Sequence, residues 1–131
     1  MKERPNDRGL IKVARANLTA AKRDILETDE VWVNFALFNI SQAVEKTIKY
    51  LCSCNGIDYD YGHYVHLLAD QLRERNVFIP DLVYNSLEEY GKFATRARYT
   101  ASQLTTRGYV DKHIECVDVW ISDIEKQISL F

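Results

Sequence analysis

The C-terminal part of the chain carries an apolar side chain at alternating steps of four and three residues. The residues of this stripe are Val110, Ile114, Val117, Ile121, Ile124 and Ile128. That spacing places all of them on the same side of an α-helix. Comparable stripes recur along the chain, whereas no segment of any length alternates apolar and polar residues. Because such alternation is typical of a half-buried β-strand, the sequence predicts an all-α fold.

The periodicity predicts a small number of separate helices. They cover about residues 10–27, 29–54, 63–75, 80–97 and 110–128. Four of them are long and their connections are short, which favours an up-and-down four-helix bundle with an additional short helix. We expect residues 1–9 to form a flexible arm and residues 10–131 to form a single domain.

The second segment is predicted to be the central helix of the bundle. One apolar stripe runs along it from Val33 to Leu51. A second stripe, on another side of its first half, consists of Val31, Phe35 and Phe38. A helix that is apolar on two sides is expected to be buried on two sides. Asp29 suits the cap at its start, and Gly56 supplies the left-handed residue that ends it.

Composition restricts the classes of partner. The chain has 17 basic and 19 acidic residues, a formal charge of −2, which argues against nucleic-acid binding over the whole surface. No window approaches the roughly eighteen apolar residues that a membrane span needs. The three cysteines, Cys52, Cys54 and Cys116, lack the usual spacing of a zinc site and are expected to be reduced thiols. We therefore expect a cytoplasmic protein without membrane contact and without a cofactor.

A polar face on the second segment is the first candidate site. Gln42, Glu45, Lys46 and Lys49 are three or four residues apart, so their side chains can interact on one side of the helix. They fit either a solvated helix face with an ion pair or a cleft or subunit interface. The second interpretation draws on their place in a helix that is otherwise predicted to be central.

The loop before the third segment is rich in tyrosine, aspartate and histidine. His63 and His66 are one turn apart, with Asp58 and Asp60 nearby in the sequence, but no motif demands a metal and none is predicted. His63 is expected to anchor the junction between loop and helix. Tyrosines beside basic groups could also stack on a nucleotide base.

Basic residues gather near the end of the fourth segment. Lys92 and Arg96 are four residues apart, and Arg98 and Tyr99 follow directly. Cations there can simply complement the negative end of the helix dipole. The alternative is a phosphate site, because the guanidinium group offers a planar fork of donors that matches phosphate oxygens.

Three short motifs in a fixed order resemble the HEPN domain family. They are Gln-Ala-Val-Glu-Lys at residues 42–46, Gly-His at 62–63 and Arg-Tyr at 98–99. The resemblance implies an up-and-down helical bundle that commonly forms a homodimer. It implies a partner that is either a nucleotide or a nucleotidyltransferase, in some cases within a toxin–antitoxin pair. Members with Arg-Tyr at this point are usually regarded as non-catalytic. Thr100 stands here in place of the usual proline after Arg-Tyr.

The leading hypothesis from the sequence is therefore a HEPN binding module that is not an enzyme. Arg96, Arg98 and Arg107 would hold phosphate, with Tyr99 or a loop tyrosine against the base. Gln42, Glu45, Lys46, Lys49 and His63 would form a cleft or an interface.

One alternative function is that of a ribonuclease. Ribonuclease members of the family carry an Arg followed by a His at a fixed spacing. Arg107 and His113 have that spacing, and the pair could cleave RNA without a metal. The counterpart of the catalytic arginine in the family pattern is Arg98, and no histidine follows it at the required distance. A second alternative is a purely structural helical interaction protein.

Overall fold

A computed structural model describes residues 7–59, 64–97 and 105–129 of the chain. All regular structure in these residues is helical, which confirms the predicted all-α class. The helices are α1 (Gly9–Asp24), α2 (Glu30–Cys54), α3 (Val65–Glu74), α4 (Asp81–Asn85), α5 (Leu87–Ala97) and α6 (Arg107–Ser129). No helix among the described residues is both long enough and apolar enough to cross a membrane.

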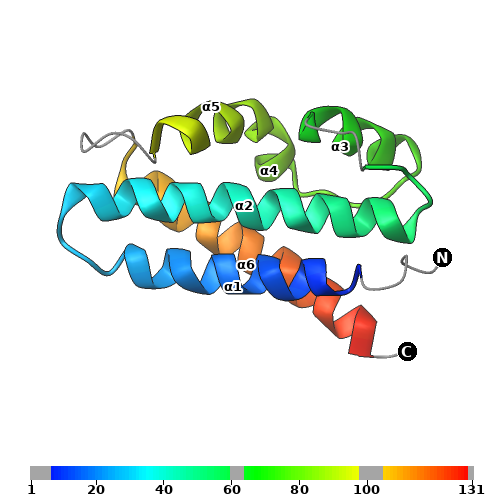
Figure 1. The fold of residues 1–131 in the computed structure, drawn as a ribbon, viewed down its shortest axis with the longest axis horizontal. Coiled ribbons are helices and arrows are strands. Elements are labelled where there is room, and N and C mark those ends of the chain that lie inside the picture. The colour runs from blue at the N-terminus through cyan, green and yellow to red at the C-terminus, as the bar shows by residue number, and fades with distance from the viewer. Residues whose placement is uncertain (1–6, 60–63, 98–104, 130–131) are drawn as a thin grey trace.

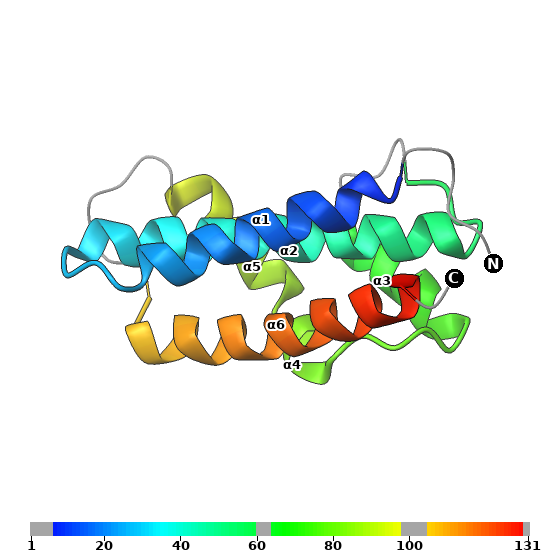
Figure 2. The same ribbon diagram turned by 90° about the horizontal axis from the view of Figure 1, so that it is seen from below.

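The long helices form a bundle around α2. Helix α1 runs back along α2, and α3 and α5 lie on the opposite side of it (Figure 1). Helix α6 lies beside α1 when the molecule is turned, with the short α4 on its other side (Figure 2). Because α2 contacts α1, α3, α5 and α6, the prediction that it is the central helix is confirmed.

The ends of α2 follow from local chemistry. The carboxylate of Asp29 accepts a hydrogen bond from the backbone N–H of Val31 at 3.1 Å and so caps the first turn. At the other end Gly56 has a φ of 68°, a conformation that glycine adopts without a steric penalty. Both signals were readable in the sequence. The predicted arm of residues 1–9 lies largely outside the described residues, and α1 begins at Gly9.

The fourth predicted helix is not continuous, which corrects the expectation for residues 80–97. It is interrupted at Ser86, which has a φ of −107° and a ψ of 1°. The Ser86 hydroxyl donates to the carbonyl of Leu82 at 2.7 Å, and its backbone N–H donates to the carbonyl of Val83 at 3.0 Å. A serine that bonds to the preceding turn competes with helix continuation. The backbone N–H of Tyr90 donates to the carbonyl of Ser86, and α5 continues from there.

The second apolar stripe predicted on α2 is only partly buried, which corrects a second expectation. Phe35 is 36% exposed, and Val31 and Phe38 are half-buried. The core side of α2 is widened by small residues instead. Fully buried alanines on α1 and α2 are Ala14, Ala21, Ala36 and Ala43. Small side chains at a contact between helices allow the two helix axes to approach closely, so these alanines favour close packing of α1 against α2.

Candidate ligand-binding cavity

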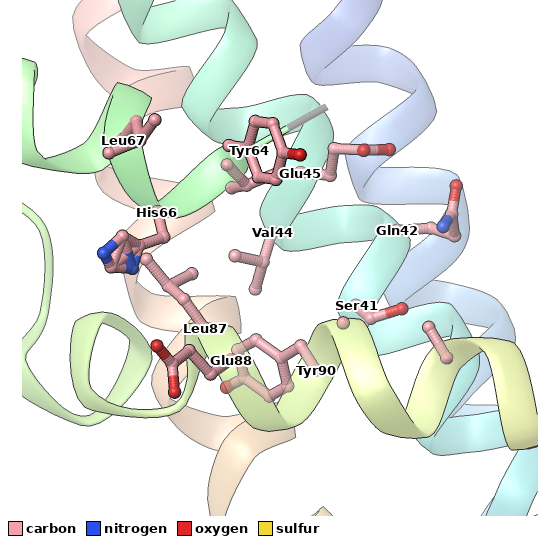
Figure 3. Close-up of a pocket in the computed structure, with 13 residues that line it drawn as sticks. Ser41, Gln42, Val44, Glu45, Tyr64, His66, Leu67, Leu87, Glu88 and Tyr90 are labelled. Carbon is pink, nitrogen blue, oxygen red and sulfur yellow. The ribbon is translucent and has the colours of Figure 1, made fainter. Parts of the chain in front are cut away.

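A cavity of about 420 Å³ opens between α2, the start of α3 and the start of α5. Its lining consists of Ser41, Gln42, Val44, Glu45, Tyr64, Val65, His66, Leu67, Leu87, Glu88, Tyr90, Gly91 and Ala94 (Figure 3). The three segments are distant in sequence and meet only because α3 and α5 pack on the same side of α2. Its volume lies within the range of about 300–1,000 Å³ typical of small-molecule sites.

The inner wall of the cavity is apolar. Val44 on α2 and Leu87 and Tyr90 on α5 are at least 92% buried and form this wall (Figure 3). Gly91 follows Tyr90 on α5 and also lines the cavity. The space beside it is open, because a Cβ atom placed on Gly91 would have no neighbour within 4 Å. An apolar wall with open space before it can accept a flat ring.

Polar side chains surround this wall at the rim. Glu45 and Gln42 come from α2, Glu88 from α5, and His66 from the first turn of α3. Tyr64, directly before α3, also lines the cavity and is 71% exposed. No lysine or arginine is among the described residues that line the cavity. The rim therefore offers mostly hydrogen-bond acceptors.

A buried polar network behind the wall fixes Tyr90. Its hydroxyl is hydrogen-bonded to Nδ1 of His113 on α6, and the His113 ring is stacked on Tyr109 with 4.1 Å between ring centroids. The Tyr109 hydroxyl in turn donates to a carboxylate oxygen of Glu89 at 2.8 Å. Since its hydroxyl is engaged with α6, Tyr90 presents its ring to the cavity. The network also ties α5 to α6.

Burial shifts the pKa values within this network. It lowers the pKa of His113 to about 4, and the positive charge of Lys112 adds to the shift. Burial likewise raises the pKa of Tyr109 to about 12, and its hydrogen bond to Glu89 acts in the same direction. The pKa of Tyr90 is also raised, mainly by burial. All three side chains are therefore neutral at physiological pH.

A comparison with known protein families identifies the fold around this cavity. The family model described as the HEPN domain matches residues 8–127, which include nearly all of the six helices. The chain belongs to the HEPN domain family. The family that the three motifs indicated is thereby confirmed. No curated protein and no solved structure matches this chain.

The first motif of this HEPN domain lies at the cavity rim. Gln42 and Glu45, predicted to form a cleft or an interface, both line the cavity. Lys46 Nζ lies 3.3 Å from one carboxylate oxygen of Glu45 and 3.2 Å from the side-chain oxygen of Gln42. Lys49 Nζ lies 3.8 Å from the other oxygen of Glu45. The two lysines thus hold the Glu45 carboxylate in place and are not themselves part of the lining. His63 is outside the described residues.

Of the residues predicted to bind phosphate, Arg96 and Arg107 are described, and neither lines the cavity. Arg96 is exposed near the end of α5 and is not part of the cavity lining. Arg98 and Tyr99 are outside the described residues. Arg107, at the start of α6, has a structural contact of its own. Its guanidinium donates to the backbone carbonyls of Ile25, at 2.6 Å, and Glu27, which follow α1.

Replacing Arg107 by methionine should therefore destabilise the HEPN domain without affecting ligand binding. The part-buried carbonyl of Ile25 loses a charged donor, which costs about 1–3 kcal/mol, whereas the exposed carbonyl of Glu27 can bond to water. We therefore expect a loss of about 2 kcal/mol in the free energy of unfolding. Chemical denaturation measures it. Arg96→Met is the matched control, because an exposed side chain should change the stability by no more than about 0.5 kcal/mol. Equal stability of both variants would contradict a structural role for Arg107.

The histidine of the ribonuclease alternative lies in the core. The His113 side chain is 1% exposed, and the guanidinium of Arg107 is bonded to the carbonyls after α1. A histidine with a pKa of about 4 that does not reach solvent is poorly placed to exchange a proton with RNA. The geometry gives this alternative no support, and it stays a prediction. RNA cleavage that persists in EDTA and is lost in His113→Ala is the result it requires.

The described part of the chain contains no cluster of metal-ligating side chains, and its most buried cysteine is not activated. Within residues 7–59, 64–97 and 105–129, no three His, Cys, Asp or Glu side chains come close enough to share a metal ion. Cys52, Cys54 and Cys116, which all lie in these ranges, form no disulfide bond. Burial raises the pKa of Cys52 to about 11, which keeps this thiol protonated and unreactive at neutral pH.

Sequence reasoning missed most of the cavity. The predicted stripe from Val33 to Leu51 includes Val44 as a core residue, and Leu87 and Tyr90 were given no role in a site. The signal that could have revealed a cavity is the pair of small residues Gly91 and Ala94, which follow Leu87 on the same side of α5. Small residues beside a buried position leave space unless a neighbouring side chain fills it.

Proposed function

We propose that this HEPN domain is a nucleotide-binding module that holds the base of its ligand in the cavity between α2, α3 and α5. The observation that supports this most directly is a cavity of about 420 Å³ with an apolar inner wall and a polar rim. Val44, Leu87 and the ring of Tyr90 would cover one face of the base. Tyr64, exposed at the mouth, would stack on the ligand, as aromatic side chains commonly do with bases.

The charge of the rim indicates which part of a nucleotide enters. The carboxylates of Glu45 and Glu88 and the side-chain oxygen of Gln42 accept hydrogen bonds, and the described lining contains no cation. A phosphate group inside the cavity would be repelled by these carboxylates, because the two lysines that pair with Glu45 do not line the cavity. The amino groups and ring N–H groups of a base are donors and suit the same positions. The base is therefore the part that the cavity accepts.

The phosphates would extend toward the end of α5. Arg98, predicted to bind phosphate, comes four residues after Ala94, which lines the cavity. Arg96, by contrast, follows Ala94 by two residues, which in a helix corresponds to the opposite side. We assign phosphate to Arg98 because the family resemblance makes it the cation of the Arg-Tyr motif; Arg98 and Tyr99 lie outside the described residues.

Filling the cavity with Gly91→Leu should abolish nucleotide binding while the fold is kept. The added side chain has room, since nothing lies within 4 Å of a Cβ at this position. Leucine is also favoured over glycine inside a helix by about 0.5–1 kcal/mol, so the Tm should not fall. We would measure thermal shifts with ATP, GTP, other nucleotides and short RNA. A ligand at about a hundred times its Kd adds about 2.7 kcal/mol to the wild type, a shift of several degrees.

Two further variants separate the cavity from the phosphate site. Gly108→Leu is the matched control, because Gly108 lies at the start of α6 with equally open space and does not line the cavity. Arg98→Ala should weaken the binding of a nucleotide but not that of its nucleoside. A nucleotide shift that persists in Gly91→Leu would exclude the cavity. No shift with any ligand would instead favour a protein partner, such as the nucleotidyltransferase that the family resemblance implies.

A further inference from the structure

Two polar side chains from the same helix are neighbours at the cavity rim. Gln42 and Glu45 are three residues apart on α2, about one turn, so they lie on the same side of this helix (Figure 3). Both contact a single ammonium group. Lys46 Nζ lies 3.2 Å from the side-chain oxygen of Gln42 and 3.3 Å from a carboxylate oxygen of Glu45. Lys46 therefore holds the amide and the carboxylate next to each other.

The contact with Lys46 also determines which atoms this pair offers to a ligand. An ammonium group only donates hydrogen bonds, so the oxygen of the Gln42 amide is the atom that faces Lys46. The amide nitrogen, with its two N–H groups, is then the donor that Gln42 can offer. An ionised carboxylate only accepts hydrogen bonds. The rim on α2 thus presents a donor at Gln42 and, one turn later, two acceptor oxygens at Glu45.

Glu45 is held more firmly than the other carboxylate of the rim. Lys49 Nζ lies 3.8 Å from its second oxygen, and the side chain of Glu45 is only 28% exposed. Glu88, from α5, is exposed to solvent. A side chain that is already ordered loses less conformational entropy when a ligand binds. Glu45 is therefore the carboxylate that is best placed to distinguish one base from another.

We propose that the cavity selects guanine among the nucleobases through hydrogen bonds to Gln42 and Glu45. This inference rests on the proposed nucleotide-binding function and specifies the base. The Watson–Crick edge of guanine carries O6, N1–H and the N2 amino group in this order. Gln42 donates to O6, and the carboxylate of Glu45 accepts from N1–H and from the N2 amino group together. Hydrogen bonds to this edge are a common way for proteins to recognise an unpaired base.

The same two side chains disfavour the other bases. Adenine has an amino group where guanine has O6, and an unprotonated N1 where guanine has N1–H. Its amino group would meet the donor of Gln42, and the lone pair of its N1 would face the carboxylate of Glu45. Cytosine has the same mismatches at N4 and N3. Hypoxanthine keeps O6 and N1–H but lacks the N2 amino group, so its affinity should lie between those of guanine and adenine.

Calorimetric titration with nucleoside 5′-monophosphates tests this selection. GMP, IMP, AMP and CMP share the ribose and the phosphate, so differences in affinity report on the base alone. GMP should bind roughly ten- to a hundredfold more tightly than AMP or CMP, with IMP in between, because a bidentate contact discriminates between bases to about this extent. Gly91→Leu should abolish the binding of all four.

Exchanging the two side chains is the sharpest test. Gln42→Glu/Glu45→Gln keeps the composition and charge of the rim but reverses the order of donor and acceptor. The carboxylate at position 42 then suits the amino group of adenine, and the amide at position 45 can donate to its N1. This double variant should prefer AMP to GMP. Glu45→Gln alone should weaken GMP binding by roughly ten- to a hundredfold. Glu115→Gln makes the same change at an exposed position of α6 outside the cavity and should keep the preference for GMP.

The outcomes separate the choice of base from nucleotide binding itself. Wild type that binds AMP as tightly as GMP would overturn the guanine assignment and leave the proposed function standing. A Glu45→Gln variant with an undiminished preference for GMP, or a folded exchange variant that still prefers GMP, would do the same. If no monophosphate binds the wild type, or if binding persists in Gly91→Leu, the base does not occupy this cavity and both proposals fail.

Discussion

Lowering the pH from about 6.5 to about 4 should cost the HEPN domain about 3 kcal/mol of stability through His113 alone. The His113 side chain is buried, and Nδ1 is hydrogen-bonded to the hydroxyl of Tyr90. Burial holds the pKa of the folded protein at about 4, against 6.5 for an exposed histidine. Within this window the unfolded chain binds a proton at this site and the folded chain does not. Stability therefore falls as the pH falls.

The slope of stability against pH measures this effect. Between pH 6 and 4.5 one histidine contributes up to about 1.4 kcal/mol per pH unit. His113→Gln removes that contribution, because the amide does not titrate, yet its oxygen can still accept from Tyr90. The comparison of urea unfolding in the two proteins at several pH values isolates His113 from the carboxylates. The variant should be clearly less sensitive to acid than the wild type.

A second histidine substitution serves as the control for this experiment. His66→Gln removes an imidazole ring from the surface of α3. The side chain of His66 is 45% exposed, and its Nε2 atom lies 3.7 Å from a carboxylate oxygen of Asp70. It tests whether the loss of any histidine flattens the profile. Equal slopes in wild type and His113→Gln would show that His113 is not buried in its neutral form. The Tyr90–His113–Tyr109 network would then need to be revised.

Leu37→Ala should destabilise the domain by about 2–5 kcal/mol. Leu37 has no exposed surface and lies on α2, which contacts α1, α3, α5 and α6. Truncation removes buried methyl groups and leaves a hole that the surrounding helices cannot fill without moving. For a domain of this size the Tm should fall by roughly 10 °C. Calorimetry or CD-monitored melting measures it directly.

The same substitution at an exposed leucine shows whether burial is the cause. Leu26, between α1 and α2, is 81% exposed. Leu26→Ala should change the free energy of unfolding by no more than about 0.5 kcal/mol. A small effect at Leu37 would mean that α2 is not the central helix of the bundle.

The local features of the fold were readable from the sequence alone. Apolar side chains at steps of three and four residues fix which side of a helix is buried, so the all-α class and the central position of α2 could be predicted. Asp29 and Gly56 act within one or two residues of themselves, and both do what was expected of them. The three motifs at residues 42–46, 62–63 and 98–99, taken together, also indicated the HEPN family.

Contacts between distant segments decided the rest. Arg107 was assigned to phosphate or catalysis, yet its guanidinium bonds to carbonyls that precede it by about eighty residues. Tyr109 precedes His113 by four residues on α6, so this stacking is local, but the contact of His113 with Tyr90 joins α6 to α5. The spacing of one helix does not say which ring another helix brings to it. The break at Ser86 is a local exception: its hydroxyl donates to the carbonyl of Leu82, a side-chain bond that apolar periodicity does not report.

The cavity is the clearest case of a feature that only the tertiary structure determines. Sequence periodicity reports which side of a helix turns inward, and Val44, Leu87 and Tyr90 do turn inward. It does not report how far apart two helices stand or which side chain fills the space between them. The size of that space depends on how α2, α3 and α5 pack together, and at Gly91 no side chain fills it.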